Sequence, residues 1–435
     1  MRPLGGAVVT ELEYAIRHGG LTPKRLLKKI TRRQFGVSVL GGLIGTAASR
    51  LINTPSAAAA SNDFTLAIIP DPQYLAESCP DMSGRYYAAM MQWIVDNKNI
   101  VLQSSTPPFA ANIKAVIGVG DCVNVAVDDQ FRNAEAAWRI LDKNGVAFTT
   151  PPGNHDYPNF SEGISSRNGL GAQFKKGYFS ARSRSKVYGS GIDLGGGDKA
   201  YWIGSRDSTG ANTAVKFVIS GVGLLVLAMD FFAGNAAWSW AYDVMMANPD
   251  CECYITTHAW LTAWGTQYQR THGYGPDFYS MPGPPYANSA VEAWNTAGVN
   301  TWPNLFGIFC GHDIFDHRRP APPGASAAWF WQQVPIKSNS SRQQTVQQLF
   351  VNSQELDHAC SRLVEQATGA GQIASIFLLS RRPGLGLLEG RMVATQSANW
   401  FKSKSPAFPG GTSWSDSETL LFSVPFTGLQ KGRPT

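Results

Sequence analysis

Charge is scarce in this chain, since only 16% of its 435 residues are Asp, Glu, Lys or Arg. The net charge of +6 misrepresents most of it, because nine of the 37 Lys/Arg and two of the 31 Asp/Glu lie in residues 1–60. The 28 bases and 29 acids that remain nearly cancel. Because nucleic-acid binding needs a basic surface, we expect no nucleic-acid partner.

Motifs of two hydrolase classes are also missing. The sequence has no Gly-x-Ser-x-Gly nucleophile elbow and no phosphate-binding P-loop, which excludes those two classes. Its six cysteines include Cys251-Glu252-Cys253, but no second pair completes a zinc clip. Disulfides are compatible with an exported protein, although the spacing specifies no pairing, and Cys122 and Cys310 are expected to be buried. No internal repeat is present, so we expect one domain over residues 61–410.

The basic excess belongs to an N-terminal segment, residues 1–60, ordered like an export signal. Arg32-Arg33 precedes Phe35, an apolar run follows over residues 37–48, and alanines occupy residues 57–60. The apolar run is too short to span a bilayer comfortably. The arginine pair resembles a twin-arginine signal, which predicts a periplasmic or secreted protein that engages the twin-arginine machinery. The alternatives are a basic amphipathic leader and a retained membrane anchor.

Past this segment, apolar strand patterns alternate with amphipathic helix patterns, which predicts an α/β fold. The expected helices span residues 85–97, 130–144 and 236–246. The expected strands span residues 64–69, 113–119, 145–150, 200–203, 215–219, 224–229, 253–258, 305–310, 348–352, 374–379 and 390–394. Residues 157–199 and 259–288 are expected to be long loop insertions, and residues 411–435 a C-terminal tail.

Polar side chains follow the ends of these strands. Three consecutive strands end in Asp71-Pro72-Gln73, Gly120-Asp121 and Gly153-Asn154-His155-Asp156. Later strands end in His258 and in Gly311-His312. Gly, Asn and Asp are ordinary turn residues, so each loop alone would indicate little. Because open α/β sheets bind ligands at the carboxyl ends of their strands, the repetition predicts that these side chains form one site.

In this order the motifs resemble the calcineurin-like metallophosphoesterase family, most closely a bacterial branch with Asp-x-Gln in place of Asp-x-His. The resemblance covers most of residues 63–400. It implies a sandwich of two β-sheets flanked by helices, with two divalent metal ions at the strand ends. It also implies hydrolysis of a small phosphomonoester or phosphodiester. Oxygen and imidazole ligands without thiolates suit Mn, Fe or Zn.

The resemblance also assigns roles to residues. The implied metal ligands are Asp71, Gln73, Asp121, Asn154, His258 and His312. Asp121 is expected to bridge the two ions, because a shared carboxylate must sit between them. His155 is the implied general acid, which contacts the phosphate and protonates the leaving oxygen, and Asp156 is expected to orient its imidazole.

One of the two metal sites departs from the family pattern. Gln73 replaces a histidine with a weaker amide ligand, and Ile314 stands where the family has the second histidine of Gly-His-x-His. Three alternatives remain open: a weak site, a site completed by Asp313, Asp316 or His317, and a single-metal or inactive protein. A non-catalytic protein that binds metal or phosphate is therefore the competing interpretation.

The expected loop at residues 259–288 contains seven aromatic residues and directly follows His258. These aromatics could form a wall for the leaving group of a substrate, or they could simply pack against one another to order a long loop. Both interpretations remain open. His272 and His358 have no partner at metal-ligand spacing and are expected to be structural or exposed.

The export hypothesis predicts that replacing both Arg32 and Arg33 by lysine leaves precursor in the cytoplasm. A twin-arginine receptor reads the guanidinium pair, so equal charge on lysine is no substitute. Fractionation of a bacterial host that expresses each precursor measures this. Normal amounts of the double-lysine variant in the periplasm would instead favour a general secretory route.

Overall fold

The computed structural model describes residues 62–77, 85–158, 177–313, 329–337, 344–352, 374–395, 418–426 and 428. The expected signal at residues 1–60 lies outside these ranges. Within them, no helix is long and apolar enough to cross a membrane.

Two β-sheets form the centre of the described fold. The six-stranded sheet contains, in spatial order, β16 (Glu418–Pro425), β15 (Leu387–Ala394), β14 (Ser375–Arg382), β1 (Phe64–Ile69), β4 (Ile113–Gly118) and β5 (Ala147–Thr149). The eight-stranded sheet contains β12 (Trp329–Pro335), β13 (Thr345–Val351), β11 (Leu305–Cys310), β10 (Cys251–Thr257), β9 (Val222–Met229), β8 (Thr213–Ile219), β7 (Asp198–Ser205) and β6 (Ile192–Gly195). A small hairpin joins β2 (Val101–Leu102) to β3 (Phe109–Ala110).

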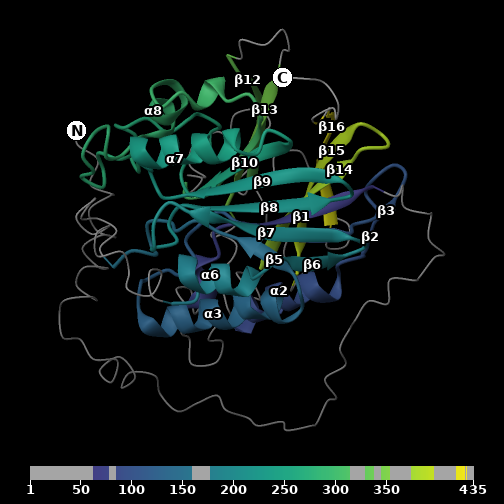
Figure 1. Ribbon diagram of the computed structural model, residues 1–435. Coiled ribbons are helices and arrows are strands. Elements are labelled where there is room, and N and C mark those ends of the chain that lie inside the picture. The colour runs from purple at the N-terminus through teal and green to yellow at the C-terminus, as the bar shows by residue number, and fades with distance from the viewer. Residues whose placement is uncertain are drawn as a thin grey trace, which may run out of the picture. The chain divides into compact units, whose positions relative to one another are not determined.

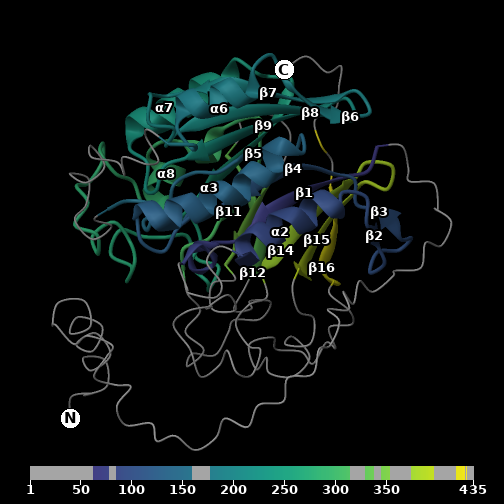
Figure 2. The same cartoon turned by 90° about the horizontal axis from the view of Figure 1, so that it is seen from below.

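Helices cover the outer faces of both sheets (Figures 1 and 2). Helices α2 (Arg85–Asp96) and α3 (Asp128–Lys143) share one apolar core with the outer face of the six-stranded sheet. Helices α7 (Asn235–Met246) and α8 (Ala290–Asn295) pack on the eight-stranded sheet. A third core lies between the two sheets. The expected α/β sandwich flanked by helices is confirmed.

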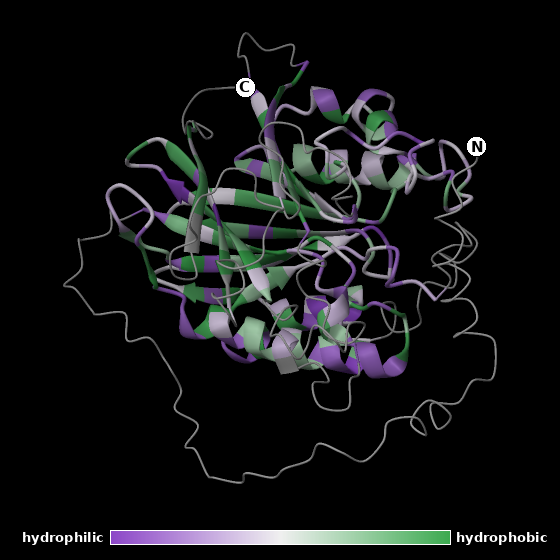
Figure 3. Ribbon diagram, turned by 180° about the vertical axis from the view of Figure 1, so that it is seen from behind, coloured by the Kyte–Doolittle hydropathy of each residue, from purple (hydrophilic) through white to green (hydrophobic). Residues whose placement is uncertain are grey.

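The strand sequences follow from this layering. Parallel strands covered on both faces read as continuous apolar runs, and every residue of β1, β10 and β11 is buried. Helix α3 instead buries a stripe that includes Phe131, Trp138 and Leu141, with acidic residues in its first turn and Lys143 in its last. Hydrophobic residues accordingly run along the strands, whereas the helices alternate between hydrophobic and hydrophilic residues (Figure 3).

The parallel strands align their carboxyl ends. In the six-stranded sheet, Ile69 of β1 pairs with Gly118 of β4, so the loops that carry Asp71 and Asp121 leave the sheet side by side. In the eight-stranded sheet, β10 runs parallel to β11, and β11 runs parallel to β13. The loops after these three strands therefore also emerge at one edge.

Two of the expected boundaries need correction. Within the expected insertion at residues 157–199, Ala181–Tyr188 forms the helix α6 and Ile192–Gly195 forms the edge strand β6. Within the expected tail at residues 411–435, β16 pairs antiparallel with β15, and Phe422 stacks on Trp331 with ring centroids 4.7 Å apart. Residues 159–176 of the insertion lie outside the described ranges.

Helix α6 lacks a visible apolar stripe because an arginine occupies part of its buried face. Arg184 is 5% exposed, makes two hydrogen bonds to Asp142 of 2.7 and 3.1 Å, and lies 3.8 Å above the ring of Phe148. The Tyr188 hydroxyl donates to the Phe148 carbonyl at 2.7 Å. These contacts fasten α6 to α3 and β5.

Replacing Arg184 by alanine should lower the free energy of unfolding by about 2–4 kcal/mol, because it leaves the half-buried Asp142 carboxylate without its cation. Arg182→Ala is the matched control, since Arg182 lies on the exposed side of the same helix. Urea denaturation of both variants measures the difference. Equal stability of the two variants would show that the ion pair contributes nothing.

Candidate metal centre

The candidate site lies where the strand ends of the two sheets meet. The Thr256 hydroxyl of β10 donates to the Gly118 carbonyl of β4 at 2.7 Å, which joins the sheets at this edge. His258 directly follows β10, and Val119 directly follows β4. Nδ1 of His258 lies 2.9 Å from the Val119 carbonyl oxygen, which is a second contact between the two sheets. The loops after β1, β4 and β5 therefore face the loops after β10, β11 and β13.

Three buried side chains form the centre of this site. Asp71, Asp121 and His258 are at most 1% exposed, and each offers a ligand atom within 4.8 Å of the other two. Oδ2 of Asp121 lies 3.0 Å from Nε2 of His258. Two carboxylates and an imidazole at this spacing form a donor set that a divalent cation could use.

The surroundings shift the pKa values of the two carboxyls in opposite directions. Burial raises the pKa of Asp71 well above its usual value, and the negative charge of Asp121 raises it further. Burial alone would also raise the pKa of Asp121, but the charges of His258 and His155 hold that pKa below its usual value. A cation between the two carboxyls would favour the charged form of both.

Unsatisfied oxygens at the site agree with a cation. Oδ1 of Asp71 and Oδ1 of Asn154 are both buried, and neither accepts a hydrogen bond. A buried acceptor without a partner costs about 1–3 kcal/mol, so such atoms are rare unless something else satisfies them. Both oxygens are suitable ligands for Mn, Fe or Zn, and the residues present therefore fit a bound metal ion.

Backbone carbonyls select the tautomer of two histidines. A carbonyl only accepts, so Nδ1 of His258 carries the proton that faces Val119, and in the neutral ring Nε2 keeps its lone pair. In His312, Nε2 lies 3.1 Å from the Tyr274 carbonyl, which leaves Nδ1 as the possible ligand atom. Burial and, secondly, the nearby charge of His258 lower the pKa of His312 to about 3, so this ring is neutral. Such carbonyl partners are typical of metal-binding histidines.

The backbone at the site is strained. Asp71, Asp121 and His312 have φ angles of 27°, 50° and 75°, in the region that L-residues avoid. Residues held this way cluster at functional sites, where the surrounding structure compensates the cost. Gly153 is required for another reason: a Cβ on it would lie 2.0 Å from Oδ1 of Asp121. The glycine lets the Asn154 loop approach the carboxylate.

Asp156 has a different position from the one expected. Its Oδ2 accepts the backbone amides of Gly153 at 2.8 Å and Cys122 at 3.2 Å, and its Oδ1 accepts that of Val123 at 3.2 Å. Asp156 therefore holds the two site loops together. The His155 imidazole is oriented by the Asn124 carbonyl, which lies 2.5 Å from Nδ1, and the sequence did not indicate this contact.

The remaining predicted ligands lie around the centre. The ring centroid of His312 is 4.8 Å from that of His258. Gln73 is buried at the start of the short helix η3 (Gln73–Ala76), two residues after Asp71. The structure therefore places all six predicted ligands at the joined strand ends, and their coordination of metal stays a prediction.

One site residue was not assigned a role from the sequence. Asn352 follows β13, and its Nδ2 donates to Oδ2 of Asp71 at 3.1 Å and to the Asp313 carbonyl at 2.9 Å. A polar residue directly after a buried strand was the available signal. Asp313 accepts the Ala263 amide at 2.7 Å, so this carboxylate helps to position the loop after His258. Ile314, Asp316 and His317 lie outside the described residues.

Six of the seven aromatic residues in the loop at residues 259–288 are either buried or exposed, and Trp264 is half-buried. Trp260, Tyr268 and Tyr279 are at most 3% exposed and belong to the core on the eight-stranded sheet, so self-packing accounts for them. Tyr274, Phe278 and Tyr286 are between 46% and 64% exposed. His272 accepts the Gln269 amide at 3.1 Å within the loop, and His358 lies outside the described residues.

The cysteines of the described residues are free thiols. Cys122, Cys251, Cys253 and Cys310 are buried and form no disulfide. Cys79 and Cys360 lie outside the described residues.

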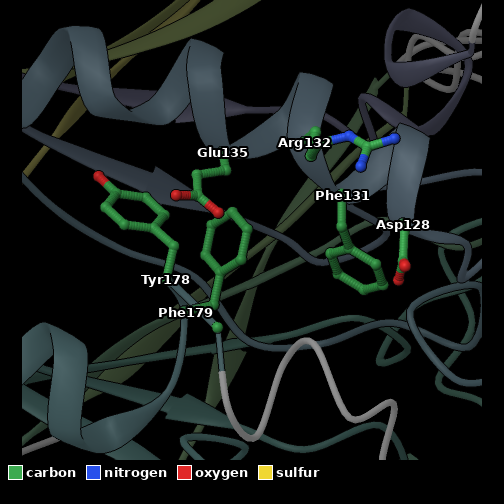
Figure 4. Close-up of a pocket in the computed structure, with 7 residues that line it drawn as sticks. Asp128, Phe131, Arg132, Glu135, Tyr178 and Phe179 are labelled. Carbon is green, nitrogen blue, oxygen red and sulfur yellow. The ribbon is translucent and has the colours of Figure 1, made fainter.

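A cavity lies elsewhere, between α3 and residues 177–179 (Figure 4). Its volume is about 180 Å³, and it is lined by Asp128, Phe131, Arg132, Glu135, Gly177, Tyr178 and Phe179. No predicted site residue lines it. It is also smaller than the roughly 300–1,000 Å³ of typical ligand pockets, so we do not assign the function to it.

Comparisons with known proteins give distant similarities. No family model matches the chain. An uncharacterised Bacillus subtilis protein, YvnB, is 25% identical over 209 residues, which are 48% of this chain and 14% of that protein. A dimetal phosphatase from Danio rerio (TM-score 0.36) and a calcineurin-like phosphoesterase, YfkN, from Bacillus subtilis (TM-score 0.32) are each 11% identical. They cover 76% and 77% of this chain and 96% and 91% of their own. Likenesses this distant do not establish an activity.

The electrostatics of the centre predict opposite effects for two Asp-to-Asn substitutions. Asp71→Asn removes one of two facing carboxyls, so the metal-free protein should be no less stable, while the rise in Tm on adding Mn²⁺ should largely disappear. Asp156→Asn should lower the unfolding free energy of the metal-free protein by about 1–3 kcal/mol, because an amide group would face a backbone N–H.

Thermal melts with and without Mn²⁺, together with metal analysis, separate these effects. An Asp71→Asn protein that binds as much Mn²⁺ as wild type and shows the same rise in Tm would remove Asp71 from the ligand set.

Proposed function

We propose that this protein is a metal-dependent hydrolase of small phosphomonoesters or phosphodiesters. The observation that supports it most directly is the buried centre of Asp71, Asp121 and His258 at the joined strand ends, with unsatisfied oxygens of Asp71 and Asn154 beside it. The dimetal character is proposed together with the activity.

Two ions, when bound, would stabilise charge on the phosphoryl oxygens and make a water molecule nucleophilic near neutral pH. Asp121 is the residue that could serve both ions, since it lies beside both Asp71 and His258. Asn154, His258 and His312 would complete one site. Asp71 and Gln73 would supply the other, with Mn, Fe or Zn as suitable metals.

His155 is suited to proton transfer. Its Nδ1 faces the Asn124 carbonyl, which fixes the ring and leaves Nε2 able to hold the proton for a leaving oxygen. Its side chain is partly exposed, whereas the proposed ligands are buried, so a substrate could reach it. Its backbone amide donates to Oδ1 of Asp121 at 2.9 Å, which holds the general acid beside the metal centre.

A protein that binds metal or phosphate without turnover is the second candidate. It is favoured by the amide of Gln73 in a position where an imidazole would bind metal more strongly. Under this alternative, one ion or none would be bound, and phosphate would bind tightly without ester hydrolysis.

We also propose that the protein is exported as a folded chain to the periplasm or beyond. The proposal depends on the Arg32-Arg33 pair and the apolar run that follows it. The twin-arginine machinery would be its transient partner, and a small phosphate ester its substrate.

A screen of generic phosphate mono- and diesters with Mn²⁺, Fe²⁺ or Zn²⁺ tests the activity, and His155→Ala tests its mechanism. The variant should lose about 10²–10⁴-fold in turnover, because that is the usual contribution of general acid–base catalysis. The loss should be smaller for nitrophenyl esters, whose leaving group barely needs a proton.

Metal analysis of the same proteins serves as the control. His155→Ala should keep the metal content of wild type, because this histidine is assigned to the leaving group. Loss of metal in the variant would make His155 a ligand, and tight phosphate binding without hydrolysis in wild type would favour the second candidate.

A further inference from the structure

Two exposed aromatic rings lie beside the candidate centre. We call Tyr274 and Phe278 the aromatic ledge. Their side chains are 46% and 56% exposed, and their ring centroids are 5.2 Å apart in an edge-to-face arrangement. Large apolar side chains exposed as a group need an explanation beyond chance, whereas a single exposed ring would not.

The ledge is directly connected to a proposed metal ligand. The Tyr274 carbonyl oxygen lies 3.1 Å from Nε2 of His312, and the ring centroids of Tyr274 and His312 are 6.1 Å apart. The ring centroids of Phe278 and Tyr279 are 5.0 Å apart, and those of Tyr279 and His312 are 5.9 Å apart. The ledge therefore lies next to His312 on the side away from the metal centre. If a phosphate were bound at that centre, the group esterified to it could reach the two exposed rings.

Other residues already hold the loop in place. Arg270 donates two hydrogen bonds of 3.0 Å to Glu292 of α8 and one of 2.7 Å to the Ala287 carbonyl. The Asp277 amide, next to Phe278, donates back to the Arg270 carbonyl at 3.1 Å. Because these contacts and the buried aromatics position the loop, the exposed rings are not needed to order it. Preorganised rings also lose little freedom when a ligand binds.

We propose that the aromatic ledge binds a flat ring in the leaving group, so that the substrates are phosphate esters of nucleosides or similar ring compounds. This rests on the proposed function, since the centre must hold the phosphate. Stacking on an exposed aromatic side chain is tolerant of ring identity. An alkyl chain would instead need a continuous apolar surface, and the ledge consists of two rings beside the exposed Asp277.

The test compares adenosine 5′-monophosphate with ribose 5-phosphate, which differ only in the base. Both are titrated calorimetrically into Mn²⁺-loaded protein that carries His155→Ala to suppress turnover. The nucleotide should bind about tenfold more tightly, and Phe278→Ala should remove that preference without weakening ribose 5-phosphate. Phe278→Tyr should retain the preference because it keeps the ring, and Phe278→Leu should lose it.

Tyr286→Ala is the matched control, because Tyr286 is 64% exposed on the same loop and has no place in the ledge. It should leave both affinities unchanged. If the two ligands bind equally, or if Phe278→Ala keeps the preference, the ledge is not a ring site although the metal centre still binds phosphate. If neither ligand binds to the Mn²⁺-loaded protein, the proposed function and this inference both fail.

Discussion

The close approach of two buried carboxyls, Asp71 and Asp121, is the constraint on which the site depends. Both carboxyls follow strands of the six-stranded sheet, and burying like charges together is among the costliest arrangements in a protein interior. The structure responds with imidazoles from the opposite sheet and with a raised pKa at Asp71. A divalent cation offsets the same repulsion more completely, and the unsatisfied oxygens of Asp71 and Asn154 agree with that solution.

The neighbouring backbone is arranged around this pair. Asp71, Asp121 and His312 have left-handed backbone conformations. Gly153 has no side chain, which lets the Asp121 carboxylate lie against its backbone. Asp156 then holds the loops after β4 and β5 together through three backbone amides. The carbonyls of Val119 and Tyr274 set the tautomers of His258 and His312. The left-handed backbone conformations are unfavourable by themselves, and their position next to the carboxyls is typical of a functional site.

The sequence predicted the sandwich well because parallel strands covered on both faces leave continuous apolar runs. Strand β1 and the ends of α2 and α7 fall within about one residue of the expected positions. The prediction from sequence failed where a polar side chain is buried and where a strand lies at the edge of a sheet. Helix α6 hides Arg184 in its buried face, and β16 pairs at an edge beyond a boundary set by composition. Polar strand ends indicated the site, but the partners of Asp156 and His155 could not be predicted, because hydrogen bonds to backbone carbonyls and amides leave no pattern in side-chain identity.

The two sheets contribute different chemistry to the centre. The six-stranded sheet supplies oxygen donors from Asp71, Asp121 and Asn154, whereas the eight-stranded sheet supplies the imidazoles of His258 and His312. A complete ligand set therefore exists only after the sheets have packed, and a cation that binds it stabilises their packing by the same free energy. The proposed export of an already folded chain is compatible with this dependence, because the ligand set would be complete, and able to bind metal, before the protein crosses the membrane.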